Sequence, residues 1–178
     1  MILQQYKIVF AGTMGAGKTT AIQSISDIPV LCTEALNTDQ HAHQKMLTTV
    51  GIDYGELTLE DGIKLGLYGT PGQERFNFIW NTICNGAIGT IILIDHTHNN
   101  PIQQINEYLN FFSKNNENLI IAITHLDSTQ YQSTKLYKEW QEQQQTHHPI
   151  FYIDARKKSD ILFILETLIA KAEVQLSI

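Results

Sequence analysis

Short apolar runs alternate along the chain with segments whose apolar residues recur every three or four positions. The apolar runs predict buried strands at Lys7–Ala11, Thr90–Asp95, Leu119–Thr124 and Ile150–Ile153. A hairpin is predicted between Thr49–Leu59 and Ile63–Tyr68, because Asp61-Gly62 is a strong signal for a tight turn. Strands that alternate with helices predict an α/β fold, in which a mostly parallel central sheet with one antiparallel strand carries helices on both faces.

Candidate N-caps mark the starts of three predicted helices, at Asn100 (followed by Pro101), Ser133 and Ser159. The faces expected to be buried are Ile102, Ile105, Leu109 and Phe112 in the first, Leu136, Tyr137 and Trp140 in the second, and Leu162, Leu165, Ile169 and Ala172 in the third. A further helical pattern comprises Phe76, Ile79, Trp80 and Ile83. Ligands of such sheets bind beyond the carboxyl ends of the strands, so the loops after Ala11, Tyr68, Asp95, Thr124 and Ile153 are the expected functional positions.

Length and charge narrow the class of protein. The 178 residues suit a single domain over residues 1–178, and the formal net charge of -6 argues against nucleic-acid partners and a polybasic membrane surface. Two cysteines are too few for a disulfide framework and favour a reduced, cytoplasmic location. The apolar runs are short, and no signal peptide, prenylation cysteine or myristoylation glycine is present, so we expect no intrinsic membrane anchor.

The segment Gly12–Thr19 fits the phosphate-loop pattern G-x-x-x-x-G-K-[ST], and it follows a predicted strand and opens a helix. Backbone amides of such a loop cradle phosphates, and the helix N-terminus adds positive potential. We expect Lys18 to neutralise the β- and γ-phosphates and Thr19 to offer a hydroxyl to Mg²⁺. The predicted nucleotide-binding residues here are Gly12, Met14, Gly15, Ala16, Gly17, Lys18, Thr19 and Thr20. The alternative is a glycine-rich turn that holds no ligand.

Two later segments, Thr48–Tyr54 and Gly69–Phe76, flank the predicted hairpin. Together with the phosphate loop, they resemble switch I and switch II of the Ras/Rab-type small GTPases, and most of all bacterial members related to the gliding-polarity and conservon-type GTPases. The resemblance covers nearly the whole chain and its motifs fall in the family's order. It implies a small-GTPase G domain with the P-loop NTPase fold, which binds GTP and GDP with Mg²⁺.

The resemblance assigns roles to the switch residues. Thr49 would bind Mg²⁺ and close over the γ-phosphate, Gly72 would donate its backbone N–H to that phosphate, and Gln73 would orient the attacking water. The implied catalytic residues are Gln73, Lys18 and Thr49, and the implied metal-binding residues are Thr19 and Thr49. Loss of the γ-phosphate would then release both segments. An ordinary strand threonine at 49 and a surface glutamine at 73 are the alternatives.

The base-recognition motif of the family corresponds to Thr124-His125-Leu126-Asp127, which follows a predicted strand. The resemblance implies that Asp127 accepts hydrogen bonds from guanine N1 and the exocyclic amine, a donor pair that adenine lacks. In the last motif, Asp154-Ala155-Arg156, the Ala155 N–H would read guanine O6 and Arg156 would lie near the base. The nucleotide-binding residues implied in this half are Thr124, His125, Asp127, Ala155 and Arg156. As an alternative, Asp127 caps a helix or a turn.

The sequence departs from the family pattern at the metal and phosphate positions. Gly69 stands where switch II normally has an aspartate that holds Mg²⁺ through water, so we expect weaker Mg²⁺ binding or compensation by another acid. Asp53 is the candidate for that acid; the alternative places it at a strand edge or against a partner protein. Met14 replaces a glycine of the Ras-type loop and His125 replaces the usual lysine, which imply slow or rearranged hydrolysis and weaker nucleotide affinity.

Arginine is scarce, with only Arg75 and Arg156 in the chain and none in Ala21–Thr48. An arginine finger is worth ~10³–10⁵ in rate, and neither arginine stands where a finger in cis is expected. We therefore predict a GTP-binding molecular switch that hydrolyses GTP slowly on its own and signals to a partner. The resemblance implies a regulatory partner of the roadblock type, an effector, outputs in bacterial polarity, motility or pilus control, and recruitment to a membrane or pole by a partner.

Three other functions stay open at this point. A nucleotide-binding interaction module with little or no turnover is favoured by Gly69, Met14 and His125. A P-loop kinase or ATPase is disfavoured by Gln73 and Asp127, which suit water as nucleophile and guanine as base. A purely structural α/β domain would require the phosphate-loop match to be accidental.

Overall fold

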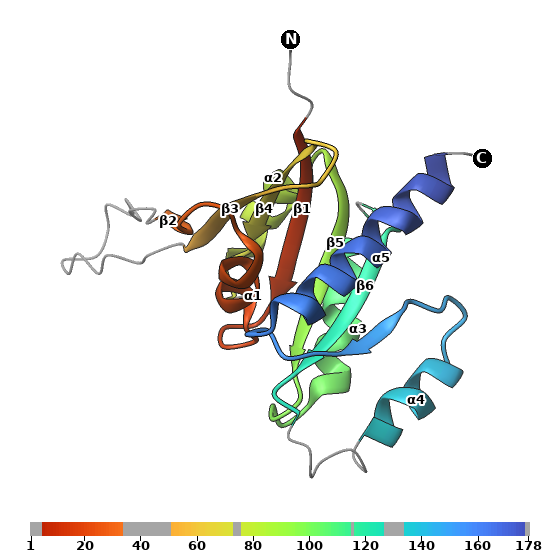
Figure 1. Cartoon of the computed structure of the whole chain (residues 1–178). Helices are drawn as coiled ribbons and strands as arrows, with labels where there is room; N and C mark the ends of the chain where they lie inside the picture. The colour runs from red at the N-terminus through yellow and green to blue at the C-terminus, as the bar shows by residue number, and fades with distance from the viewer. Residues whose placement is uncertain (1–4, 34–50, 73–75, 115, 127–133, 177–178) are drawn as a thin grey trace, which may run out of the picture.

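The computed structural model describes residues 5–33, 51–72, 76–114, 116–126 and 134–176. In this part of the chain seven strands form one sheet in the order β2-β3-β4-β1-β5-β6-β7 (Figure 1). The strands are β1 (Gln5–Gly12), β2 (Leu31–Thr33), β3 (Ile52–Thr58), β4 (Lys64–Gly69), β5 (Ala87–Asp95), β6 (Leu119–Thr124) and β7 (Ile150–Tyr152). Among these strands, β3 runs antiparallel to both of its neighbours and the remaining pairs are parallel, which confirms the predicted sheet.

Helices cover both faces of the sheet, as predicted. They are α1 (Lys18–Ile25), α2 (Asn77–Cys84), α3 (Pro101–Phe112), α4 (Lys135–Glu142) and α5 (Lys158–Leu176). Figure 1 shows α1 and α5 on one face, with α2 and α3 on the other. None of the helices in the described ranges combines the length and apolarity needed to cross a lipid bilayer.

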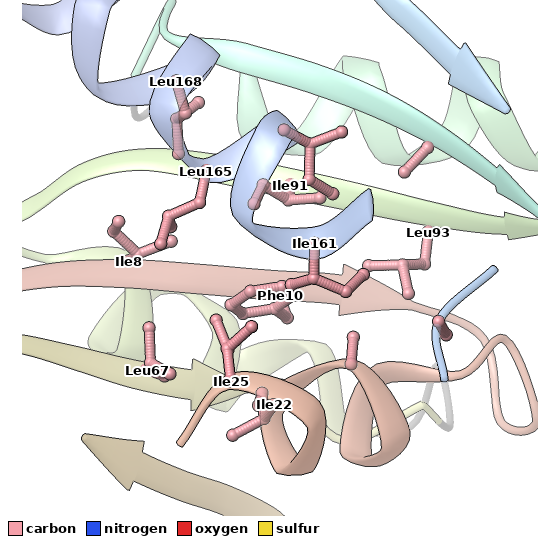
Figure 2. Packing of buried hydrophobic residues seen from close by; sticks show 14 of the residues in the cluster. Ile8, Phe10, Ile22, Ile25, Leu67, Ile91, Leu93, Ile161, Leu165 and Leu168 are labelled. Atoms are coloured by element: carbon pink, nitrogen blue, oxygen red, sulfur yellow. The ribbon is translucent and has the colours of Figure 1, made fainter. Parts of the chain in front are cut away.

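The core between the sheet and the α1–α5 face holds the strand that leads into the phosphate loop. Ile8 and Phe10 of β1 pack between Ile22 of α1 and Leu165 of α5, and all four side chains are buried (Figure 2). Complete burial of one such side chain contributes roughly 1.5–3 kcal/mol to folding. This packing fixes where β1 ends and where α1 begins, and so it fixes the loop between them.

The core on the opposite face is rich in aromatic rings. Trp80 of α2 stacks on Tyr108 of α3 at a centroid distance of 5.2 Å and on Phe112 at 5.4 Å. Its indole N–H donates to the carbonyl of Pro71 at 3.1 Å. This hydrogen bond ties the start of the predicted switch II segment to the core.

The hydrophobic pattern predicted the existence of these elements better than their details. The Asn100 cap is confirmed, because its side chain accepts from the N–H of Gln103, but α3 buries Gln104 and Tyr108 more deeply than Ile102 and Leu109. The three-residue edge strand β2 was not predicted. It has only three residues, and the apolar run Val30-Leu31-Cys32 is too short to distinguish a strand from a loop.

The predicted cap of the last helix is wrong. The α5 helix begins at Lys158, so Ser159 lies inside it. Its buried face is also turned by one residue, with Ile161, Ile164 and Leu168 buried next to the predicted Leu165, while Leu162 and Ile169 pack at the margin of the core. Ser133 lies outside the described residues, and α4 follows Thr134.

Candidate nucleotide-binding site

The loop from Gly12 to Thr19 joins the carboxyl end of β1 to the first turn of α1. Its chain curls at Gly15 and Gly17, whose φ angles are 85° and 98°. Gly17 precedes α1, and no side chain caps the first amides of that helix. Uncapped amides at a helix N-terminus, next to a curled glycine loop, are the arrangement that binds phosphate in many proteins.

Lys18 is held inside this loop. It is only 7% exposed, and its Nζ donates to the carbonyl oxygens of Gly12 at 2.8 Å and Thr13 at 2.7 Å. Burial lowers the pKa of Lys18 to about 8, and the nearby Asp53 carboxylate opposes that shift. The ammonium therefore stands at the loop as a buried cation at neutral pH, and its role toward phosphates stays a prediction.

A pocket of about 370 Å³ opens beside the loop, and we call it the phosphate-side pocket. Thr19, Asp53 and Thr70 contribute oxygen atoms to its lining. The Thr19 hydroxyl donates a hydrogen bond to Asp53 Oδ2. The Thr70 hydroxyl is buried and has no hydrogen-bond partner among the described residues. A polar atom left unpaired in a buried pocket is costly unless a ligand or water can reach it, so this pocket suits a polar ligand.

Gly72 lies directly against the phosphate loop. A Cβ placed on it would be 2.4 Å from the backbone nitrogen of Met14 and 2.7 Å from the carbonyl carbon of Thr13. Met14 itself is 75% exposed and lines the same pocket. The start of switch II and the phosphate loop therefore meet backbone to backbone, which agrees with the predicted position of Gly72.

A second pocket, of about 680 Å³, lies on the other side of the loop, and we call it the base-side pocket. Thr124, His125, Ala155 and Arg156 line it, together with Gly17 and Thr20, which also line the phosphate-side pocket. The Thr124 hydroxyl donates to the Ala16 carbonyl at 2.9 Å, across 108 residues of sequence. The predicted phosphate and base motifs are therefore brought together around one loop.

The polar side chains of the base-side pocket are tied to their neighbours. His125 has a positive φ of 59°, and its Nδ1 lies 3.0 Å from Thr124 Oγ1 and 3.5 Å from Asp95 Oδ1. Arg156, whose side chain is 79% exposed, forms a two-pronged pair with Asp154, with both N···O distances 2.8 Å. These hydrogen bonds lower the pKa of Asp154 to about 2. Neither the His125 ring nor the Arg156 guanidinium can move without breaking such contacts.

Three predicted site residues, Thr49, Gln73 and Asp127, lie outside the described residues, so their roles stay predictions. The structure also adds residues that the motifs did not indicate. Thr97 and Tyr152 line the base-side pocket, and Cys32 lines the phosphate-side pocket. Thr97 and Tyr152 stand at the carboxyl ends of β5 and β7, so the strand-end rule could have found them. The position of Cys32 depends on the edge strand β2, which at three residues is too short for the apolar pattern to predict.

The oxygen donors of the phosphate-side pocket fit Mg²⁺. The described residues contain no group of three or more His, Cys, Asp or Glu side chains placed to hold a metal, so they form no all-protein metal cage. Mg²⁺ binds one or two protein oxygens and takes its other ligands from phosphates and water. The Thr19 hydroxyl and the Asp53 carboxylate supply such a pair.

The sheet order and the loop between β1 and α1 define a P-loop domain with the G-domain fold. The G domain of the T. maritima FeoB iron transporter matches with a TM-score of 0.62 at 17% identity, covering 96% of this chain and 99% of that chain. The cytosolic domain of the same transporter in its GMPPNP form matches with a TM-score of 0.63 at 17% identity, covering 94% of this chain and 64% of that chain. At this level of identity the similarity establishes the fold.

The chain belongs to the family described as conserved hypothetical ATP binding protein, whose model matches residues 29–170. The matched range begins after the phosphate loop and α1. Among curated relatives, the Ras-related protein Rab-10 of Diplobatis ommata is 32% identical over 107 residues, which cover 58% of this chain and 48% of the relative. The chain thus spans about half the length of this relative.

Proposed function

We propose that this chain is a GTP-binding molecular switch that hydrolyses GTP to GDP and phosphate. The observation that carries the proposal is that one loop, Gly12–Thr19, is shared by two pockets of different chemistry. One pocket has a buried lysine and oxygen donors for a metal, and the other has the strand-end residues that face a base in proteins of this fold class. A nucleoside triphosphate needs both chemistries at once.

The choice of guanine rests on several observations. Asp127 follows β6 directly beyond Thr124-His125-Leu126, and Thr124 is anchored to the phosphate loop by its hydroxyl. The similarity to the Ras-related protein Rab-10 and to the cytosolic domain of the FeoB iron transporter in its GMPPNP form favours guanine as well. The family description names ATP, so the base is the part of the proposal that most needs a direct measurement.

The chemistry proposed for the phosphate-side pocket is mainly positioning and charge stabilisation. The Lys18 ammonium would neutralise the terminal phosphates, and the Gly72 amide, packed on the loop, would donate to the γ-phosphate. Bound Mg²⁺ would supply further positive charge at the phosphate oxygens. Gln73, the next residue after Gly72, would orient the water that attacks the γ-phosphorus.

We further propose that turnover is slow without a partner. Arg156 lies at the base-side pocket, where its guanidinium pairs with Asp154, and Arg75 lies outside the described residues. A regulatory protein, of the roadblock type that the resemblance implies, would then raise the rate, and an effector would bind the triphosphate form. A cytoplasmic location and a relation to the bacterial gliding-polarity and conservon-type GTPases stay predictions from the sequence.

Phosphate release from GTP by the purified chain tests this proposal. The expected rate is ~10⁻⁴ to 10⁻² s⁻¹, the range of G domains that act alone or with only an internal arginine. Gln73→Leu should abolish release while it leaves GDP affinity unchanged, and the exposed Gln143→Leu should change neither quantity. A wild-type chain that binds GTP but releases no phosphate over hours would favour an interaction module without turnover. A rate above about 1 s⁻¹ would contradict the need for a partner.

A further inference from the structure

We propose that Asp53 of β3 is the metal-site carboxylate of this protein, in place of the side chain that Gly69 of switch II lacks. The inference rests on the proposed function, because the metal would be the Mg²⁺ that accompanies the nucleotide. The carboxylate at the metal would then come from β3, and not from β4, which leads into switch II.

Register places the two positions side by side. In the antiparallel ladder between β3 and β4, Asp53 pairs directly with Gly69. Side chains of directly paired residues lie on the same face of a sheet and about 5 Å apart. A Cβ built on Gly69 would be 3.0 Å from Asp53 Cβ and 3.1 Å from Asp53 Oδ2. The carboxylate of Asp53 therefore occupies the space that a side chain at position 69 would use.

Burial excludes the alternative positions for Asp53. The β3 strand lies between β2 and β4, so Asp53 is not on a sheet edge, and at 7% exposure it does not face a partner protein. Among the described residues no ion pair involves this carboxylate, and its hydrogen-bond donor is the Thr19 hydroxyl. Burial of a carboxylate is costly; the Lys18 ammonium lies nearby, and a divalent cation at this position would stabilise the carboxylate further.

The hydrogen bond from Thr19 to Asp53 leaves both side chains able to bind the same cation. By donating its proton to Asp53 Oδ2, the Thr19 hydroxyl leaves its oxygen lone pairs for a cation. Both residues line the phosphate-side pocket next to Lys18. One carboxylate and one hydroxyl, completed by phosphate oxygens and water, are the donors that Mg²⁺ prefers.

The glycine at position 69 is explained by the same contact. Its φ is not in the left-handed region, so the strand conformation does not require glycine there. Space favours glycine, because a Cβ would lie 3.0 Å from Asp53 Cβ and 3.3 Å from the Ile22 side chain, and both neighbours would have to shift by a few tenths of an ångström. The glycine in place of the switch II aspartate thus leaves the space that the Asp53 side chain occupies.

The test measures binding of Mn²⁺, which shares the oxygen preference of Mg²⁺ and is visible by electron paramagnetic resonance, to the full chain loaded with GDP. Asp53→Asn keeps an acceptor for the Thr19 hydroxyl but removes the charge, and we expect Mn²⁺ affinity to fall about 10–100-fold. Affinity for GDP without metal should not fall with it, since removal of a negative charge from the phosphate-side pocket does not weaken the binding of an anion. Glu60→Gln, an exposed acid on the same hairpin, is the matched control and should change neither quantity.

A double variant that moves the carboxylate from position 53 to position 69 tests the assignment most sharply. In Asp53→Gly/Gly69→Asp the charge moves to the neighbouring strand and the crowded Cβ is removed, so Mn²⁺ affinity should recover most of the loss. Gly69→Ala keeps every carboxylate but presses a methyl group on Asp53, so it should weaken Mn²⁺ several-fold even if Asp53→Asn does not fold. Wild-type Mn²⁺ affinity in Asp53→Asn or in Gly69→Ala would overturn the assignment of Asp53. A wild-type chain that binds no GDP at all would instead overturn the proposed function.

Discussion

The phosphate-side and base-side pockets share Gly17 and Thr20, yet they are built in opposite ways. The first keeps its charges buried, with Lys18 and Asp53 both less than a tenth exposed. The second exposes its polar side chains, because that of Arg156 is 79% exposed and that of His125 is 46% exposed. Charges interact more strongly where water is excluded. The difference teaches that electrostatic binding energy should come from the phosphate side, whereas the base side should select its ligand by directed hydrogen bonds.

The largest expected effect comes from Lys18→Met. A hydrogen bond to a charged group is worth about 1.5–3 kcal/mol, and each 1.4 kcal/mol is a factor of ten, so the loss of Lys18 should weaken GDP binding about 10–100-fold. Calorimetry on the purified chain can measure this change. Lys157→Met is the matched control, since that lysine is exposed at the base-side pocket and should cost less than about threefold. Equal losses of GDP affinity in the two variants would contradict the claim that the phosphate-side pocket supplies most of the electrostatic binding energy.

A smaller effect is expected from Gly72→Ala. The added methyl group would stand 2.4 Å from the Met14 backbone nitrogen, so switch II must move away from the phosphate loop. GTP affinity should fall about tenfold, and GDP affinity should change little, because the Gly72 amide would serve only the γ-phosphate. The measured quantity is the ratio of GTP to GDP affinity. Gly62→Ala, at the hairpin tip and outside both pockets, controls for general strain, and a GDP loss equal to the GTP loss would contradict the assigned role.

The smallest effect is expected on the base side, from His125→Ala. The ring is half exposed, and its Nδ1 already faces Thr124 and Asp95, so its removal should change GDP affinity by about threefold or less. Exchange of fluorescently labelled GDP reports the change. His98→Ala, an exposed histidine outside both pockets, is the control. A loss of tenfold or more would show that the base side also depends on the His125 ring.

The sequence predicted the sheet, the helices on both faces and the loop that joins the two pockets, because each has a strong local signal. The strands follow from apolar runs, the hairpin from Asp61-Gly62, and the loop from Gly12–Thr19. The register of Asp53 against Gly69 was beyond reach, because it depends on how the turn closes rather than on which residues form it. The sequence named Asp53 as a candidate acid, but its pairing with Gly69 required the fold.

The buried face of α5 shows a different limit of sequence reasoning. Residues 161–165 are all apolar, so the pattern does not distinguish one helical face from the next. Packing on β1 and α1 selects Ile161, Ile164 and Leu168. On α3, Gln104 is buried although it is polar, which a hydrophobic pattern cannot anticipate. The part of the candidate site that a backbone loop forms was predictable from the sequence. The part that depends on contacts between neighbouring strands was less predictable.

Competition for labelled GDP by unlabelled GTP and ATP, measured on the purified chain with Mg²⁺, tests most directly whether this protein is a guanine-nucleotide switch. We predict that GTP displaces the label and that a large excess of ATP does not. In Asp127→Asn the acceptor for guanine N1 becomes a donor, so the preference should move from guanosine to xanthosine nucleotides. Displacement by ATP as effective as displacement by GTP would contradict the proposed function and would agree with the ATP of the family description.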